Sequence, residues 1–288
     1  MILDQLLRTP QPERDAAYDN TAAVQNAAQQ LADFEARGAV LLTRVDARLD
    51  IRYGPAERQT FDYFCGQEGL PTLLFVHGGY WQMRHKNTFR FVLEGALSKG
   101  LHGALVGYTL APEAGLSRIV EQVRGSVAAV RAQALSAGGS GAILLCGWSA
   151  GAHLAAMALQ CGGVTAGLGI SGIYDLGPLR QTYLNQALQL TDSEVALLSP
   201  LRLPQVHKPF VTAYGTAELP QLQAQSRAFH AHRRGAPGTV CTVAGANHFS
   251  ILDALASPEG ALLQQLWTVA FPPGAKAKGD GLKGIATA

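Results

Sequence analysis

The chain has 288 residues with a formal charge of +2, and 48% of its residues are apolar while 15% are charged. This composition is typical of a globular protein with large buried sheets, and no basic stripe suggests a nucleic-acid partner. The apolar runs are short and broken, so none reaches the roughly 20 residues that span a bilayer, and we expect neither a signal peptide nor a membrane partner. Four scattered cysteines without a CxxC motif indicate reduced thiols in a cytoplasmic protein.

Apolar periodicity predicts strands and helices in regular alternation along the chain. Residues 14–37, rich in Ala and Gln, predict a helix or helix pair, and the alternating segments 45–53 and 59–65 predict half-buried strands. Continuous apolar runs predict strands buried on both faces at 72–76, 103–108, 142–146, 166–170, 209–213 and 240–243. Helix-like segments lie between or after these runs at 87–98, 116–135, 150–159, 222–232 and 258–270. The alternation predicts a mostly parallel twisted sheet with helices on both faces.

The domain organisation follows from these elements. We expect a single domain over residues 1–271. Residues 179–204 are longer than a simple crossover needs, so we expect a helical excursion over the site, which with 14–37 forms a small helical cap. Residues 272–288 are rich in Gly, Lys and Ala without apolar periodicity, and this composition predicts a disordered tail.

The sequence GWSAG at residues 147–151 matches GxSxG between a predicted strand and a predicted helix. That strand–turn–helix setting is the nucleophile elbow of the α/β-hydrolase fold, in which the serine stands on a tight turn at the carboxyl edge of the sheet. The helix that follows favours negative charge at its first turn. We therefore predict an α/β-hydrolase fold with Ser149 as the nucleophile.

The sequence HGGYW at residues 77–81 closes the first buried strand. A tetrahedral intermediate of acyl transfer carries a negative oxygen that needs backbone N–H groups aimed at it, and glycine lets the backbone approach closely. We expect Gly78, Gly79 and Ala150 to form this oxyanion hole. Two such pieces, each at the end of a strand, favour acyl-transfer chemistry over a chance glycine turn.

Eight histidines compete for the role of general base, and His248 is preferred because it follows the last predicted strand in a Gly-rich loop. This agrees with the chain order Ser, acid, His of the fold. The acid is expected after the strand 209–213, where Glu218 is the one carboxylate of its loop. Asp175, after the preceding strand, stays open as an alternative, and Asp253 lies beyond the histidine. We expect His85, His102, His230 and His232 to be solvated.

Two other signals are weak. The sequence GLGISG at residues 167–172 matches the GxGxxG pattern but is not followed by the long helix of a dinucleotide site. No HExxH and no cluster of His, Cys and carboxylates stands at ligand spacing. We therefore expect neither a metal nor a cofactor.

Five motifs together resemble the arylformamidase (kynurenine formamidase) group in the esterase/lipase branch of α/β hydrolases, over residues 18–255. They are HGGYW at 77–81, YTLAPE at 108–113, GWSAGAHLAA at 147–156, SGIYDL at 171–176 and NHF at 247–249. The resemblance implies hydrolysis of the formamide of N-formylkynurenine without metal or cofactor. It matches Ser149 to the nucleophile, His248 to the base and Gly78 and Gly79 to the oxyanion loop, and Glu218 stands where many relatives have Asp.

Three functions remain open at this stage. The first is an arylformamidase-like amidase, the second a short-chain carboxylesterase on the same triad, and the third a catalytically silent binding protein, which the intact Ser149, His248 and glycine loop disfavour. The expected partner is a small amide or ester. We expect the substrate pocket to be lined by His77, Tyr80, Trp81, Trp148 and Tyr174. Monomer and homodimer both remain open.

Overall fold

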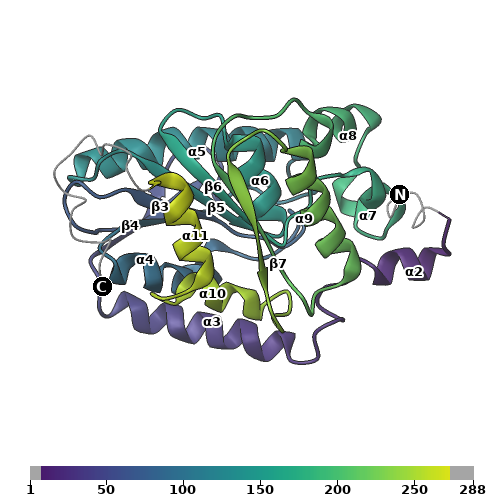
Figure 1. Ribbon diagram of the computed structural model, residues 1–288, viewed down its shortest axis with the longest axis horizontal. Helices are drawn as coiled ribbons and strands as arrows, with labels where there is room; N and C mark the ends of the chain where they lie inside the picture. Colours follow the sequence, from purple (N-terminus) through teal and green to yellow (C-terminus); the bar gives the residue numbers. More distant parts are fainter. Residues whose placement is uncertain (1–7, 273–288) are drawn as a thin grey trace.

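The strands form one eight-stranded sheet in the computed structural model, which describes residues 8–272 (Figure 1). The strand order is β1-β2-β4-β3-β5-β6-β7-β8. The strands are β1 (Ala47–Arg52), β2 (Thr60–Phe64), β3 (Thr72–Val76), β4 (His102–Val106), β5 (Ile143–Trp148), β6 (Val164–Ile170), β7 (Phe210–Gly215) and β8 (Gly238–Val243). β2 runs antiparallel to both β1 and β4, and every other neighbouring pair is parallel. The predicted mostly parallel sheet is confirmed.

Helices cover both faces of this sheet (Figure 1). One face packs against α5 (Leu116–Ser136), α6 (Ala150–Ala158) and α9 (Pro220–His232). The other face packs against α3 (Ala27–Leu42), α4 (Glu94–Ser98), α10 (Asp253–Ala256) and α11 (Ala261–Ala270). Shorter elements connect them: α2 (Gln11–Ala16), η1 (Lys86–Leu93), η2 (Gly177–Gln181), α7 (Asn185–Leu188), α8 (Asp192–Leu198), η3 (Pro200–Arg202) and η4 (Ser250–Leu252). This is the predicted α/β-hydrolase architecture.

The continuous apolar runs are explained by the two-sided core. In β3, Leu74 and Val76 belong to the core under α5 and α6, whereas Leu73 and Phe75 belong to the core under α3 and α11. Successive side chains of a strand point to opposite faces, so a central strand covered on both faces needs an apolar residue at every position. All five residues of β3 are accordingly buried.

The last strand differs from the prediction of burial on both faces. β8 pairs only with β7 within residues 8–272, and its residues alternate between exposed and half-buried. An edge strand has one flank open to solvent and less cover on its faces, which explains the difference.

The predicted helical segments near the termini are also refined. The prediction for 14–37 is a helix or a helix pair, and the structure has the pair: α2 ends at Ala16 and α3 begins at Ala27, and the residues between them reach the candidate site described below. The excursion 179–204 carries α7 and α8 and is tied to α2, because the Tyr183 N–H donates to Asp15 at 2.7 Å. The predicted disordered tail beyond residue 272 lies outside the described residues. Within 8–272, no helix is both long and apolar enough to cross a membrane.

Candidate active site

Ser149 stands on a strained turn between β5 and α6. Its backbone has φ 57° and ψ −120°, a conformation that costs a non-glycine residue about 1–3 kcal/mol. The turn forms because its neighbours lack a Cβ: one added to Gly147 would lie 2.0 Å from Gly151 O, and one added to Gly151 would lie 2.0 Å from Val76 O. The Ser149 N–H donates to Ile170 O at 2.7 Å and fixes the turn to β6. The sequence thus folds locally to present one hydroxyl at the carboxyl edge of the sheet.

The glycine loop after β3 lies directly against this turn. A Cβ added to Gly78 would meet Ser149 Cβ at 2.8 Å. Gly79 has a φ of +106°, and a Cβ there would lie 2.2 Å from Met83 O. Glycine is therefore required at both positions, and the loop backbone and the first turn of α6, from Ala150, surround Ser149.

His248 and Glu218 form a buried pair beside the turn. His248 Nδ1 lies 3.2 Å from Glu218 Oε2, and the Glu218 side chain is fully buried. The other carboxylate oxygen accepts hydrogen bonds from Ser171 Oγ at 2.7 Å and from the Gly215 N–H at 2.6 Å. Because the carboxylate holds the proton on Nδ1, it leaves Nε2 free to act as a base. His248 and Ser149 line the same cavity.

The two competing carboxylates have other partners. Asp175 Oδ1 binds the Arg202 guanidinium at 3.0 Å and accepts from the Gly177 N–H at 2.9 Å, so it fixes its own loop. Asp253 binds Arg37 at 2.6 Å. The structure therefore brings Glu218, and neither Asp175 nor Asp253, to the imidazole.

Trp148 has a contact that the sequence did not reveal. Its indole Nε1 donates to the main-chain oxygen of His248 at 2.8 Å, and the two rings lie 4.8 Å apart. Trp148 also lines the cavity, as expected for a pocket residue. The residue before the candidate nucleophile therefore fastens the loop that carries the candidate base, a contact between positions a hundred residues apart with no local signature.

His77, expected to line the pocket, is instead buried and does not line the cavity. Its Nδ1 donates to Gly78 O at 2.7 Å, and the Tyr108 hydroxyl donates to His77 O at 2.9 Å. Burial lowers the pKa of His77 to about 3, so its ring is neutral. His77 therefore stabilises the glycine loop through its hydrogen bond to Gly78.

Trp81 and Tyr174, also expected in the pocket, are fully buried away from it. The Trp81 ring meets His153 edge-on at 5.0 Å, and Tyr174 stacks on Phe229 at 4.0 Å. Both are core residues, because the loops that carry them turn inward after their strands. Among the five expected pocket residues, Tyr80 and Trp148 line the cavity.

The expectation that His102 is solvated is wrong. His102 is fully buried at the start of β4, where Nδ1 accepts from the Tyr63 hydroxyl at 2.8 Å and from the Gly66 N–H at 3.0 Å. Its Nε2 donates to Gln67 O at 3.0 Å. Both ring nitrogens of His102 thus have hydrogen-bond partners, as buried polar groups require, and the polar residues near it in the sequence do not reveal this burial.

The cavity beside Ser149 is small, about 20 Å³. Its walls come from the glycine loop, the elbow, the His248 loop and the segment between α2 and α3, which lies within the expected cap segment 14–37. They comprise Asn20, Thr21, Gly79, Tyr80, Met83, Arg84, Trp148, Ser149, His248 and Phe249. Of the two segments expected to form the cap, 14–37 therefore contributes to the lining of this cavity and 179–204 does not. Asn20 is the residue that sequence reasoning missed.

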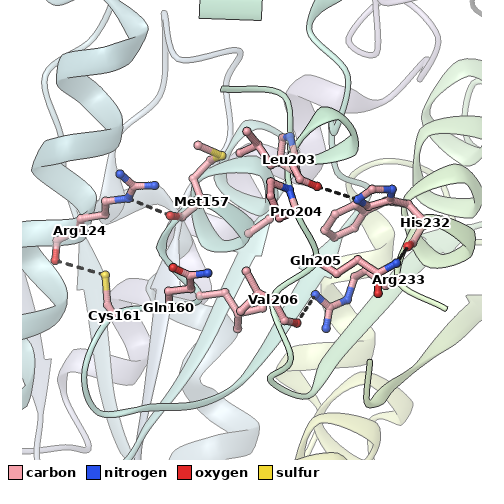
Figure 2. A pocket seen from close by; sticks show the side chains of 14 residues that line it. Arg124, Met157, Gln160, Cys161, Leu203, Pro204, Gln205, Val206, His232 and Arg233 are labelled. Atoms are coloured by element: carbon pink, nitrogen blue, oxygen red, sulfur yellow. Dashed lines mark hydrogen bonds between the residues drawn. The ribbon is translucent and has the colours of Figure 1, made fainter. Parts of the chain in front are cut away.

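A larger cavity of about 440 Å³ lies at the far end of α6 (Figure 2). Arg124 Nε donates there to Met157 O at 2.8 Å, and His232 Nε2 donates to Leu203 O at 3.0 Å. Neither Ser149 nor His248 lines it. This cavity is larger than the one beside Ser149, but the groups able to do acyl-transfer chemistry gather at the smaller one. Across residues 8–272, no three His, Cys, Asp or Glu side chains are grouped to hold a metal ion.

Comparison with known proteins shows the family to which the chain belongs. Residues 73–200 match a family model for the α/β hydrolase fold. The chain is 33% identical over 238 residues to kynurenine formamidase of Danio rerio, covering 76% of this chain and 80% of the relative. The chain belongs to the kynurenine formamidase family of α/β hydrolases. This hydrolase is also 31% identical to kynurenine formamidase of Salmo salar, with the same coverage.

Solved structures give the same fold for this arylformamidase-like hydrolase. A Silicibacter protein suggested to be a thioesterase superposes with a TM-score of 0.79 at 30% identity, covering 88% of this chain and 98% of that one. Esterase B of Lactobacillus rhamnosus superposes with a TM-score of 0.67 at 19% identity, covering 88% and 96%. The second likeness concerns the fold alone. Together with the relatives above, the family shows that the chain is a hydrolase.

Proposed function

We propose that this hydrolase cleaves the formamide of an N-formylkynurenine-type aromatic amine with a triad of Ser149, His248 and Glu218. The observation that carries the proposal is the 3.2 Å contact between His248 and the fully buried Glu218, beside the strained Ser149 turn. A nucleophile, a base and a group that orients the base are the parts that serine acyl transfer requires. The substrate class follows from the relatives named kynurenine formamidase.

The proposed reaction has two halves. Ser149 Oγ attacks the formyl carbonyl while His248 Nε2 takes its proton, and the N–H groups of Gly78, Gly79 and Ala150 bind the oxyanion. Glu218 keeps the imidazole in the correct tautomer and stabilises its positive charge. The imidazolium then protonates the departing amine, leaving a formyl ester on the serine. A water, deprotonated by His248, attacks this ester and releases formate.

The size of the cavity supports a small acyl group. A volume of about 20 Å³ corresponds to roughly one water-sized group, and formyl is the smallest acyl group there is. A short-chain carboxylesterase is the second candidate, because the same residues cleave esters.

We also propose a cytoplasmic location, since the four cysteines, Cys65, Cys146, Cys161 and Cys241, are all free thiols.

Replacing the nucleophile tests the proposal. Ser149→Ala should lower kcat by about 10⁵–10⁶-fold, because the members of a triad act as a unit. Turnover of N-formylkynurenine beside p-nitrophenyl acetate measures the effect, and a fluorophosphonate probe followed by peptide mass spectrometry identifies the labelled serine. Ser136→Ala, at an exposed serine on α5, is the matched control and should change neither readout. Clear turnover by pure, folded Ser149→Ala would refute the nucleophile assignment.

A further inference from the structure

Asn20 lies in the candidate site although nothing in its sequence neighbourhood suggests a function. It belongs to the segment between α2 and α3, is only 4% exposed, and lines the cavity that holds Ser149 and His248. A buried amide in this position either makes a structural hydrogen bond that holds the segment in place or contacts the substrate.

The orientation of the Asn20 amide is fixed by Tyr80. Burial raises the pKa of Tyr80 well above its ordinary value, so its hydroxyl is protonated and has one hydrogen to donate. That hydrogen goes to Tyr18 O at 2.5 Å, because a carbonyl can only accept. The hydroxyl oxygen must therefore accept from Asn20 Nδ2, which lies 2.7 Å away. The amide nitrogen of Asn20 faces Tyr80, and its oxygen faces elsewhere.

Asn20 Oδ1 is buried without a donor. Among the described residues 8–272, no group donates a hydrogen bond to it. A buried acceptor left unpaired costs about 1–3 kcal/mol, and buried polar groups that have no protein partner need a reason. The hydrogen bond to Tyr80 involves only Nδ2 of Asn20, so a purely structural role does not explain why Oδ1 is buried without a donor. A donor from a bound molecule in the cavity would satisfy it.

The substrate that supplies such a donor is an amide. When a carbonyl carbon is attacked by Ser149 and its oxygen lies in the glycine loop, the adjoining atom of an amide carries an N–H, whereas that of an ester carries only an acceptor. We propose that Asn20 Oδ1 accepts the N–H of the scissile amide and is the specificity-determining residue for amides over esters. This inference rests on the proposed function and names the substrate class of that same site.

The energetics favour discrimination in one direction. An amide satisfies Asn20 Oδ1, but an ester of the same shape leaves it unpaired and sets an oxygen against it. Sites built to hydrogen-bond a substrate N–H reject the analogue that lacks it because their own buried group then loses its partner. The loop that carries Gly79 and Tyr80 thus contacts both atoms of the scissile bond. Its backbone N–H groups bind the carbonyl oxygen, and Tyr80 orients the Asn20 amide that accepts the substrate N–H.

A matched substrate pair tests this. Formanilide and phenyl formate share the formyl and phenyl groups and differ only in N–H against O. Asn20→Leu should lower kcat/KM for formanilide by about 10–100-fold and for phenyl formate by less than about 3-fold, since a lost hydrogen bond of about 1.4–3 kcal/mol corresponds to such a factor. Asn26→Leu, an exposed asparagine of the same segment, is the control and should leave the ratio unchanged.

A second variant covers the case in which Asn20→Leu does not fold. Tyr80→Phe keeps the ring but frees the Asn20 amide to rotate, so the amide-to-ester ratio should fall in the same direction by a smaller factor. Equal losses on both substrates, or an unchanged ratio in the folded variants, would overturn the role of Asn20. Fluorophosphonate labelling separates the two levels: a wild-type enzyme that does not label at Ser149 refutes the proposed function, whereas a labelled enzyme with an unchanged ratio refutes only the inference about Asn20.

Discussion

Two carboxylates among residues 8–272 have fully buried side chains, and they differ in their partners. Asp62, on β2, contacts Lys86 and lies 2.9 Å from the Arg90 guanidinium. Glu218, after β7, lies against His248 as its one basic partner within residues 8–272. Asp62 thus lies between a lysine and an arginine, whereas Glu218 faces an imidazole.

The difference separates a structural carboxylate from one suited to catalysis. Removing a carboxylate from water costs several kcal/mol, and the cost must be offset by charge or hydrogen bonds. The Asp62 carboxylate already has two cationic partners in the resting protein, so a proton transfer would not strengthen its interactions. Glu218 is held mainly by neutral donors, so it gains most when His248 becomes an imidazolium. Burial alone therefore does not identify a functional carboxylate, but the kind of charge beside it does.

The largest effect is expected at Glu218. Glu218→Gln should keep the fold, because Gln fills the same volume, and lower kcat by about 10³–10⁴-fold through loss of the orienting charge. Steady-state kinetics on one amide and one activated ester measure it. Asp175→Asn, in the alternative acid bound to Arg202, should cost far less. A large loss of kcat in Asp175→Asn together with a nearly unchanged kcat in Glu218→Gln would make Asp175, and not Glu218, the acid of the triad.

A large effect of a different kind is expected at Asp62. Asp62→Asn leaves Lys86, only 1% exposed, without its buried counter-charge, so the free energy of unfolding should fall by about 3–5 kcal/mol. The kcat of the folded fraction should change less than about 3-fold. Urea titration and active-site-titrated kinetics measure the two quantities.

A neighbouring carboxylate provides the control for Asp62. Asp50 also contacts Lys86 but its side chain is 63% exposed, so Asp50→Asn should cost less than about 1 kcal/mol. A kinetic defect in Asp62→Asn at unchanged stability would erase the distinction between the two buried carboxylates.

The smallest effect is expected at Trp148 and asks whether Glu218 alone positions His248. Trp148→Phe keeps an aromatic ring but removes the donor to His248 O, so kcat should fall about 10-fold, which corresponds to about 1.4 kcal/mol. The same variant should lose about 1–3 kcal/mol of stability because a buried carbonyl is left unpaired. Trp267→Phe, on α11, should change neither rate nor substrate preference. An unaltered kcat would mean that the carboxylate contact suffices.

Local patterns made much of this structure predictable. The run of four apolar residues in β3, from Leu73 to Val76, follows from cover on both faces, and the elbow around Ser149 follows from glycines that only a tight strand-to-helix turn requires. Chain order narrowed the candidate acid to the loop whose Glu218 contacts His248. Such features can be predicted from the sequence because they are caused by residues only a few positions apart.

Features caused by distant residues were not predictable. The apolar run of β8 reads like those of the central strands, but its exposure depends on its place at the edge of the sheet. His102 reads as a surface residue, and its burial depends on Tyr63 and Gln67. Asn20 reads as an ordinary loop residue, and only folding brings it beside Ser149.

The position of Asn20 along the chain has a consequence for how such enzymes diversify. Residues 73–200, the stretch matched by the general hydrolase model, carry Ser149 but not Asn20. On the proposal above, the triad residues Ser149, Glu218 and His248 and the specificity-determining Asn20 therefore lie in separate stretches of the sequence. Substitutions in the N-terminal segment can change substrate choice while the triad stays intact. Grafting residues 17–26 from one family member onto another is accordingly a compact route to redesigning selectivity.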